Sequence, residues 1–372
     1  MKKLFLLALP LALVATGACS DSAGPKGGGS SSSGGTDAGA DADPIATGGT
    51  EVAVTVPETG RVYVKLGAEP AVVTPADPKT DKGWDIAFEG LDVYTNSGPS
   101  GSGQSRAFGP NDAVVFIGDT APEVPEVLLM GDKTGGAFIR WYFYEGAPTH
   151  ALQSRFHMFG VKDGDKAYKV QVVSYYGERD GAPVAALYRV RWAQVIPQLG
   201  ATQELTNIDG TATGADAANE CLDLGTGQKI ALSPTDALAS SAWHLCFRRQ
   251  NISVNGELGG PRNIGAVDFD ADKTATEKLN DILAKTPESE QAHFDAISGP
   301  DFQAPTFRGD RVVSAFSGLW LKKGVSPPAP EPVAWLVIGA DGKSNNLVGF
   351  ASFDGANDKT PGTIHMRVKA VK

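Results

Sequence analysis

Short stretches in which apolar and polar residues alternate dominate the chain after residue 50. Residues 61–66 place an apolar side chain at every second position, and residues 84–88 repeat this period of two. Residues 170–175 and 187–192 are rich in β-branched and aromatic side chains. A period of two sends successive side chains to opposite faces of a strand. The pattern therefore predicts an all-β protein built mainly from antiparallel strands.

One stretch, residues 271–300, departs from this pattern. Thr274 and Glu277 have the spacing of a helix capping box, and apolar residues follow at helical spacing as far as Leu283. Pro287 then stands where the first position of a second short helix is expected. The sequence predicts a short helical insertion in an otherwise β chain.

The chain contains two copies of one sequence unit. Trp84-x-x-x-Phe88 returns as Trp243-x-x-x-Phe247, 159 positions later, and Asn96 returns as Asn255 at the same offset. Later matches share an offset of 178; they are Asp163-Gly164 with Asp341-Gly342, Ser174 with Ser352, Gly177 with Gly355, and Arg189-Val190 with Arg367-Val368. We therefore predict two tandem β domains, residues 51–198 and 213–372, joined by a linker at 199–212. The helical insertion 271–300 belongs to the second domain.

The N-terminus has the pattern of a secretion signal. Two lysines precede an apolar run at residues 4–15, which is too short to span a bilayer as a mature helix. Residues 16–19, Thr-Gly-Ala-Cys, resemble the bacterial lipobox, although Thr16 departs from its usual aliphatic residue. The resemblance implies a signal peptide at 1–18 and a lipid chain such as palmitate on Cys19. The alternative is an ordinary signal peptide that contains a cysteine.

The segment that follows the lipobox predicts a tether. Residues 20–50 hold nine glycines and almost nothing apolar, so residues 19–50 should act as a flexible connection to the membrane. Ser20, rather than aspartate, follows the cysteine, which by resemblance to the common sorting rule favours the outer membrane of a Gram-negative bacterium. We therefore expect a lipid-anchored protein, either periplasmic or exposed at the cell surface.

Composition limits the function classes further. The chain has 43 acidic and 33 basic residues, a formal charge of −10, and no long cluster of lysine or arginine. Nucleic acid is therefore not an expected partner, because its capture depends on clustered positive charge. The sequence contains neither G-x-S-x-G nor H-E-x-x-H, and no zinc-ligand spacing. We expect a non-catalytic protein without a metal site of its own.

The first copy resembles the HmuY family of bacterial surface lipoproteins over roughly residues 60–195. The residues that carry the resemblance are Gly83-Trp84-Asp85-Ile86-Ala87-Phe88, Tyr94-Thr95-Asn96-Ser97-Gly98 with its loop to Gly103, Trp141-Tyr142-Phe143-Tyr144, Asp163-Gly164, Tyr168-Lys169-Val170-Gln171-Val172 and Ser174-Tyr175-Tyr176. The resemblance implies two tandem HmuY-like β domains, the second diverged: it has His244 in place of Asp85, and all eight tyrosines lie in the first copy.

The family binds haem at the cell surface and holds the iron between two loop side chains, histidines or methionines. The resemblance therefore implies a haemophore-like role in iron acquisition, with haem as ligand. A haem-carrying protein and an outer-membrane receptor are the expected partners. The competing hypothesis is a structural or interaction lipoprotein that uses the same scaffold and binds no cofactor, since one fold serves many functions.

Three residues are candidate axial ligands of haem, which needs neutral imidazole or thioether groups beside the ring. His150 follows the aromatic stretch 141–144, where the resemblance places a ligand loop, but it could also be an exposed loop histidine. Met130 precedes a glycine-containing loop and could either bind iron or fill a gap in the core. His157 aligns with Trp335 at the offset of 178, which favours a packing role over ligation.

Two cysteines in the second copy are candidates for a disulfide. Cys221 and Cys246 have the same facing on two strands that should be neighbours. An exported protein meets an oxidising compartment, which favours a disulfide over free thiols.

Overall fold

The computed structural model of the protein describes residues 44–372. Within them the protein is mainly β, with antiparallel strand pairs and a few short helices, which confirms the all-β prediction at this coarse level. The predicted signal peptide 1–18, Cys19 and most of the predicted tether lie outside the described residues. The last part of the 19–50 segment is already structured, because α1 (Pro44–Thr47) buries Ile45 beside Phe116.

Two sheets share an apolar core and are called body 1. Side chains of both sheets meet in this core, among them Val54, Phe88, Trp335 and Met366, all of them buried. The strand orders are β1-β22-β21-β20-β6 and β3-β2-β4-β5. The strands are β1 (Thr50–Thr55), β2 (Val62–Lys65), β3 (Ala71–Val73), β4 (Ile86–Glu89), β5 (Asp92–Thr95), β6 (Arg106–Asp112), β20 (Val333–Ile338), β21 (Asn345–Asp354) and β22 (Thr363–Val371).

Two further sheets share a second core and are called body 2. Phe159, Val190, Leu222 and Phe247 are among its buried side chains. The strand orders are β13-β12-β11-β10-β18 and β15-β14-β16-β17. The strands are β10 (Met158–Asp163), β11 (Lys166–Arg179), β12 (Ala182–Ile196), β13 (Gln203–Asp209), β14 (Asn219–Leu222), β15 (Lys229–Leu232), β16 (Leu245–Arg248), β17 (Asn251–Val254) and β18 (Gly265–Asp268).

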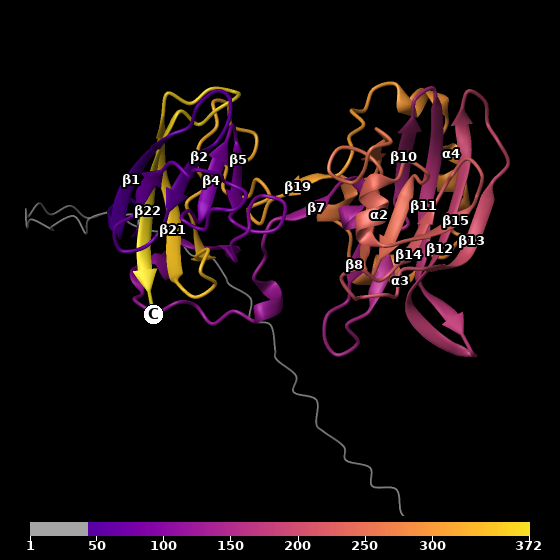
Figure 1. Ribbon diagram of the computed structural model, residues 1–372, viewed down its shortest axis with the longest axis horizontal. Helices are drawn as coiled ribbons and strands as arrows, with labels where there is room; N and C mark the ends of the chain where they lie inside the picture. The colour runs from indigo at the N-terminus through magenta and orange to yellow at the C-terminus, as the bar shows by residue number, and fades with distance from the viewer. Residues whose placement is uncertain (1–43) are drawn as a thin grey trace, which may run out of the picture. The chain divides into compact units, whose positions relative to one another are not determined.

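Body 1 is assembled from both ends of the described chain. β1 pairs with β22, and β6 pairs with β20; in Figure 1 the indigo β1 lies beside the yellow β22. Body 2 likewise pairs β10 with β18 and β12 with β13. The strand pairings therefore do not follow the predicted domains 51–198 and 213–372, and the predicted linker 199–212 contains β13.

The two bodies are nonetheless built to one plan. At the offsets of the sequence repeat, β2, β4 and β5 correspond to β14, β16 and β17, and the hairpin β21–β22 corresponds to β11–β12. Each body thus combines the first half of one sequence copy with the second half of the other. The exchange buries the apolar face of each half against its counterpart from the other copy.

Two short strand pairs lie on the connecting segments. β7 (Lys133–Gly135) pairs with β19 (Arg311–Val313), and Thr134 faces Val312. These two residues are 178 positions apart, which is the repeat offset itself, so the pair joins equivalent points of the two copies. The other pair is the hairpin of β8 (Tyr142–Tyr144) and β9 (Leu152–Ser154).

The helices are short and lie mostly in the second sequence copy. The predicted insertion 271–300 does hold two of them, but they begin later than predicted: α3 at Leu279 and α4 at Gln291, after a turn. The α-helices after α1 are α2 (Pro234–Ala239), α3 (Leu279–Leu283) and α4 (Gln291–Ala296). The 3-10 segments are η1 (Ala113–Ile117), η2 (Glu126–Leu128), η3 (Ala137–Arg140), η4 (Lys273–Ala275) and η5 (Gly299–Phe302).

Charged side chains from body 2 hold α4 in place. The buried Lys169 donates from Nζ to the carbonyl oxygens of Phe294 and Ile297, at 2.9 and 3.1 Å. A cation at the carbonyl end of a helix satisfies groups that have no partner within the helix. Arg191 reaches Gln291 Oε1 at 2.8 Å from the same sheet. The insertion therefore covers the outer face of the β10–β13 sheet.

Candidate functional site

The first candidate ligand, His150, lies at the exposed end of the β8–β9 hairpin. Its backbone has a φ of +53°, in the left-handed region. The Tyr144 hydroxyl and His150 Nδ1 form a hydrogen bond, and the two ring centres are 5.9 Å apart. Among the described residues, His150 Nε2 has no hydrogen-bond or ion-pair partner. The structure therefore brings a tyrosine and a histidine together at the surface with one imidazole nitrogen open.

The second candidate, Met130, lies elsewhere. Its backbone forms a β-bridge with Ala107 of β6, in which each N–H donates to the other carbonyl oxygen, with N···O distances of 2.8 and 2.9 Å. Its side chain is 40% exposed. This methionine therefore belongs to the edge of body 1, whereas His150 lies on a hairpin that contacts body 2 through Tyr176 of β11. The predicted pair of ligands is not brought together.

The third candidate, His157, is buried in a cluster of charges. Its Nδ1 lies 2.9 Å from Asp268 Oδ2, and its Nε2 lies 3.2 Å from Glu277 Oε2. Glu277 also pairs with Arg155 and with Lys285. Burial alone would raise the pKa of Glu277, but these bonds outweigh burial and lower it. Both ring nitrogens of His157 are engaged, so it is part of a structural ion network.

A tryptophan and an asparagine form the same framework in both bodies. Asn96 donates from Nδ2 to the carbonyl oxygen of Trp84 at 2.8 Å, and Asn255 donates to that of Trp243 at 3.0 Å. All four residues are buried. Because these hydrogen bonds match in the two bodies, neighbouring positions can be compared residue by residue, and a difference there is a difference in side-chain chemistry.

Asp85 is the buried polar residue of this framework in body 1. It accepts hydrogen bonds from the backbone N–H of Leu66 at 2.7 Å and of Ala340 at 2.6 Å, and from Lys65 Nζ at 3.0 Å. The last two contacts join the two sheets of body 1 through one carboxylate. This carboxylate is therefore a cross-link between the two exchanged halves, because Ala340 belongs to the second sequence copy.

His244 replaces this carboxylate in body 2. Its Nδ1 accepts a hydrogen bond from the backbone N–H of Leu224 at 3.1 Å, and this bond requires an unprotonated Nδ1. Asp163 and Asp223 flank the ring, but Arg262 pairs with both of them at 2.8 Å. Burial, aided by Arg262, lowers the pKa of His244 to about 4 despite the two carboxylates. The imidazole is therefore neutral near pH 7.

A second buried carboxylate of body 1, Asp132, is well provided with donors. It accepts from the backbone N–H of Thr95 at 3.2 Å, from the Thr95 hydroxyl at 2.9 Å and from the Ser100 hydroxyl at 2.6 Å. Burial raises its pKa, and these hydrogen bonds oppose that effect.

Asp310 is the equivalent carboxylate of body 2. The two hydroxyl groups that donate to Asp132 have no counterpart at the matching positions around Asp310. Val254 and Gly259 stand at the matching positions, so only the backbone N–H of Val254, at 3.2 Å, donates to it with good geometry. The Ser253 hydroxyl also acts on this carboxyl group and lowers its pKa, but burial has the larger effect. The other oxygen, Oδ1, has no hydrogen-bond partner among the described residues. Burial raises the pKa of Asp310 to about 7.

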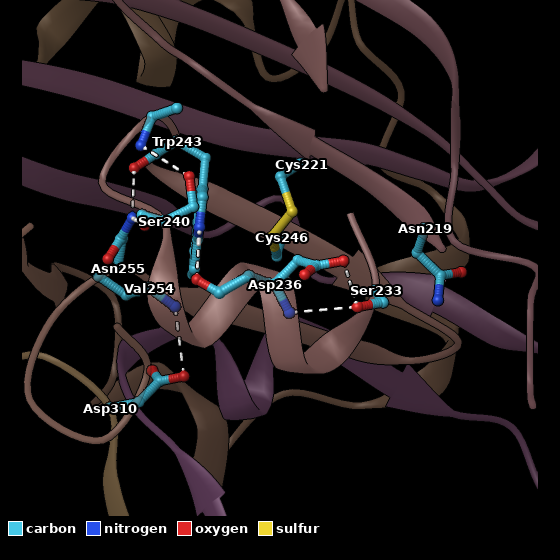
Figure 2. The surroundings of a disulfide bond; sticks show 12 residues. Asn219, Cys221, Ser233, Asp236, Ser240, Trp243, Cys246, Val254, Asn255 and Asp310 are labelled. Carbon is cyan, nitrogen blue, oxygen red and sulfur yellow. Dashed lines mark hydrogen bonds between the residues drawn. A yellow bond between two sulfur atoms is a disulfide. The ribbon is translucent and has the colours of Figure 1, made fainter. Parts of the chain in front are cut away.

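Cys221 and Cys246 are joined by a disulfide, the pair expected from the sequence. They are facing residues of β14 and β16. Figure 2 shows the bond between Trp243 on one side and the start of α2 on the other, where Ser233 caps the helix by accepting from Asp236 N at 3.1 Å. A cavity of about 260 Å³ adjoins the disulfide and is mainly apolar.

Sequence reasoning missed three of these features: the neutral His244, the partly unpaired Asp310 and the cavity. The first had a signal, since the repeat alignment already placed His244 opposite Asp85. The pairing of Tyr144 with His150 also had a signal, because the two residues flank a short turn that a hairpin would close. Asp310 had none, since its burial depends on contacts distant in the sequence.

None of the helices within residues 44–372 has the length and hydropathy needed to cross a membrane. The same part of the chain contains no group of three or more histidine, cysteine or acidic side chains arranged to hold a metal ion. Compared with known proteins, the chain matches no family model and no curated protein.

Proposed function

We propose that this protein is a lipid-anchored, non-catalytic binding protein of the outer membrane, with haem as its ligand at the Tyr144–His150 pair. In this proposal both bodies are HmuY-like, and Cys19 carries the lipid. The lipobox-like N-terminus and the resemblance of residues 60–195 support the class of protein. The observation that carries the ligand is the hydrogen bond between Tyr144 and His150.

This pair has the chemistry that a ferric haem needs. Iron in haem is held by imidazole nitrogen or by tyrosine oxygen, among other ligands. A hydrogen bond at one imidazole nitrogen fixes the ring and decides which nitrogen keeps its lone pair. With Nδ1 engaged by the Tyr144 hydroxyl, His150 can offer Nε2 to iron. If the phenol instead gives its proton to Nδ1, Tyr144 can offer its oxygen.

The surroundings of the pair suit a flat, partly apolar ligand. Tyr144 of the hairpin is 52% exposed and Tyr176 of β11 is 37% exposed, so two aromatic rings are open to a ligand. Tyr176 is tied to this hairpin, because its hydroxyl accepts from the backbone N–H of Leu152 at 3.1 Å. The porphyrin would lie against these rings. The protein would supply its ligand from this pair alone, since Met130 lies at β6 of body 1 and both ring nitrogens of His157 are engaged.

Titration with haemin tests this function. We expect a saturable complex with a sharp Soret band, which weakens in His150→Ala and shifts in Tyr144→Phe. His365→Ala is the matched control: His365 is also a surface histidine, paired with Glu51 and Asp354, and its loss should leave the spectrum unchanged. A broad band that does not saturate, or one equally affected by all three variants, would favour the cofactor-free interaction lipoprotein.

The anchor is tested separately. Cys19→Ser removes the acylated thiol and should move the protein from the membrane fraction to the soluble fraction. Metabolic labelling with a palmitate analogue should mark the wild-type chain only. If the Cys19→Ser protein stayed with the membrane, the anchor would have to lie elsewhere in the chain.

A further inference from the structure

The cavity beside the disulfide lies at a position that is filled by an aromatic ring in body 1. Tyr63 and Ala87 face each other on β2 and β4, and the repeat places Cys221 and Cys246 at those two positions on β14 and β16. One copy therefore has a large and a small side chain where the other has a disulfide. The disulfide is much shorter than a tyrosine and does not reach as far along the sheet.

The tryptophan next to this position is held identically in the two bodies. Trp84 donates from Nε1 to the carbonyl oxygen of Pro78 at 3.1 Å, and Trp243 donates to that of Ala237 at 3.0 Å. Both acceptors lie six residues before their tryptophan. The two indole rings are therefore fixed in the same way by their Nε1 hydrogen bonds, so the neighbouring side chain can be compared between the bodies.

In body 1 that neighbour is Tyr63. Its ring meets Trp84 edge to face, with ring centres 5.1 Å apart and an angle of 68° between the planes. Aromatic pairs favour this arrangement over a face-to-face sandwich. Burial of the ring raises the pKa of the Tyr63 hydroxyl. The contact is thus a packed, partly desolvated pair.

In body 2 an open cavity is lined by both Trp243 and Cys221, the residue that stands at the position of Tyr63. Its volume, about 260 Å³, is slightly below the range of about 300–1,000 Å³ that is typical of sites for drug-sized molecules. Trp243 and Leu232 are buried and half-buried in its wall, and Leu238 is 56% exposed at its side. The apolar wall includes Cys221, Leu232, Ala237, Leu238, Trp243 and Cys246.

We propose that this cavity binds a small molecule with a single aromatic ring, which packs against Trp243 as Tyr63 packs against Trp84. The substitution of a tyrosine by a disulfide has turned an internal contact into a site for an external ring. Trp243 and the disulfide both line this cavity, and Figure 2 shows them next to α2. This site is independent of the haem proposal, because the Tyr144–His150 pair does not line it.

The probe for this site is p-cresol, the side chain of tyrosine as a free molecule. In the full chain labelled with ¹⁵N, the six indole N–H signals are assigned by tryptophan-to-phenylalanine variants, and p-cresol is titrated in. We expect the Trp243 signal to shift in a saturable way, with a dissociation constant on the order of 1 mM for so small a ligand. The Trp84 signal should not move, because Tyr63 occupies its site.

Three variants that open or fill the site provide the controls. Tyr63→Ala opens the site in body 1, and the Trp84 signal should then respond to p-cresol as well. The double variant Cys221→Tyr with Cys246→Ala fills the site in body 2 and should abolish the response of Trp243. Leu232→Trp fills the same cavity without touching the disulfide and should give the same loss. An unresponsive Trp243 in the wild type, equal responses of Trp84 and Trp243, or a response that survives both filling variants would overturn the proposal.

Discussion

Bodies 1 and 2 have the same backbone arrangement around one buried polar position, which is occupied by a carboxyl group in body 1 and by a neutral imidazole in body 2. In body 1 the carboxyl oxygens of Asp85 accept hydrogen bonds from two backbone N–H groups and from Lys65. In body 2 the neutral ring of His244 receives the backbone N–H of Leu224, while the charges move outward to Arg262 and two aspartates. The comparison teaches that this position requires a hydrogen-bond acceptor for the backbone N–H that follows β2 or β14, not a particular charge.

A second difference concerns how well each body satisfies a buried carboxylate. Asp132 has two hydroxyl donors, and Asp310 has none at the matching positions. A buried polar atom without a partner costs free energy. Body 2 has therefore given up stabilising contacts that body 1 retains, at the same time as it acquired a disulfide that body 1 lacks.

The largest expected effect comes from removing the acceptor of body 1. Asp85→Ala leaves two buried N–H groups and Lys65 without their partner. We expect a loss of about 3–5 kcal/mol in the free energy of unfolding, measured by urea denaturation. His244→Ala is the matched change in body 2 and should cost less, because it removes a neutral acceptor of one hydrogen bond. Equal losses in the two variants would contradict the difference in chemistry.

The next effect is a pH dependence specific to body 2. The pKa of His244 is about 4 in the folded chain and about 6.5 in an unfolded one. Between these values the unfolded chain binds a proton that the folded chain does not bind. The free energy of unfolding should therefore fall as the pH drops from about 6.5 to about 4, by up to about 3 kcal/mol.

His244→Gln tests the source of this dependence, because glutamine can accept the hydrogen bond but does not titrate. Urea denaturation at several pH values should show a flatter profile below pH 6.5 for the variant than for the wild type. A profile that keeps its slope in His244→Gln would assign the dependence to another group.

The smallest effect should come from the two equivalent carboxylates, and its sign should differ between them. The folded pKa of Asp310, about 7, lies above the unfolded value near 3.9, so ionisation makes the fold less stable as the pH rises from about 4 to about 7. Asp310→Asn removes that penalty and should stabilise the protein at pH 8 by about 1–2 kcal/mol. Asp132→Asn places an amide among donors and should destabilise it by a similar amount. The same sign for both variants would contradict the comparison.

The sequence predicted the local elements of this fold well. Residues 61–66 contain β2, and residues 84–88 overlap most of β4. The Asp180-Gly181 pair, typical of tight turns, forms the turn between β11 and β12, and both of its residues have positive φ. Alternation and turn chemistry depend on neighbours in the chain, so they are readable from it. The start of α3 was misjudged because Thr274, which has the sequence of a cap, lies in a 3-10 turn instead.

The exchange between the copies could not be predicted in the same way. β6 has an apolar face that suits either β10 of its own copy or β20 of the other, because the copies repeat the same pattern. Only the connections and the packing of residues far apart in the sequence choose between these partners. For the same reason, the sequence left Met130 and His157 only as candidate partners of His150, and the fold gives each of them a different set of contacts.

The exchanged assembly itself is tested most directly by cross-linking its strands. Thr55 of β1 faces Thr363 of β22, and their hydroxyl oxygens are 3.0 Å apart. Thr55→Cys with Thr363→Cys should therefore form a disulfide in the monomeric protein, detected by mass spectrometry of its peptides. In a tandem arrangement β1 would instead pair within its own copy, beside Ala185, the residue that the repeat matches to Thr363. A cross-link in Thr55→Cys with Ala185→Cys, and none in the first variant, would contradict the account.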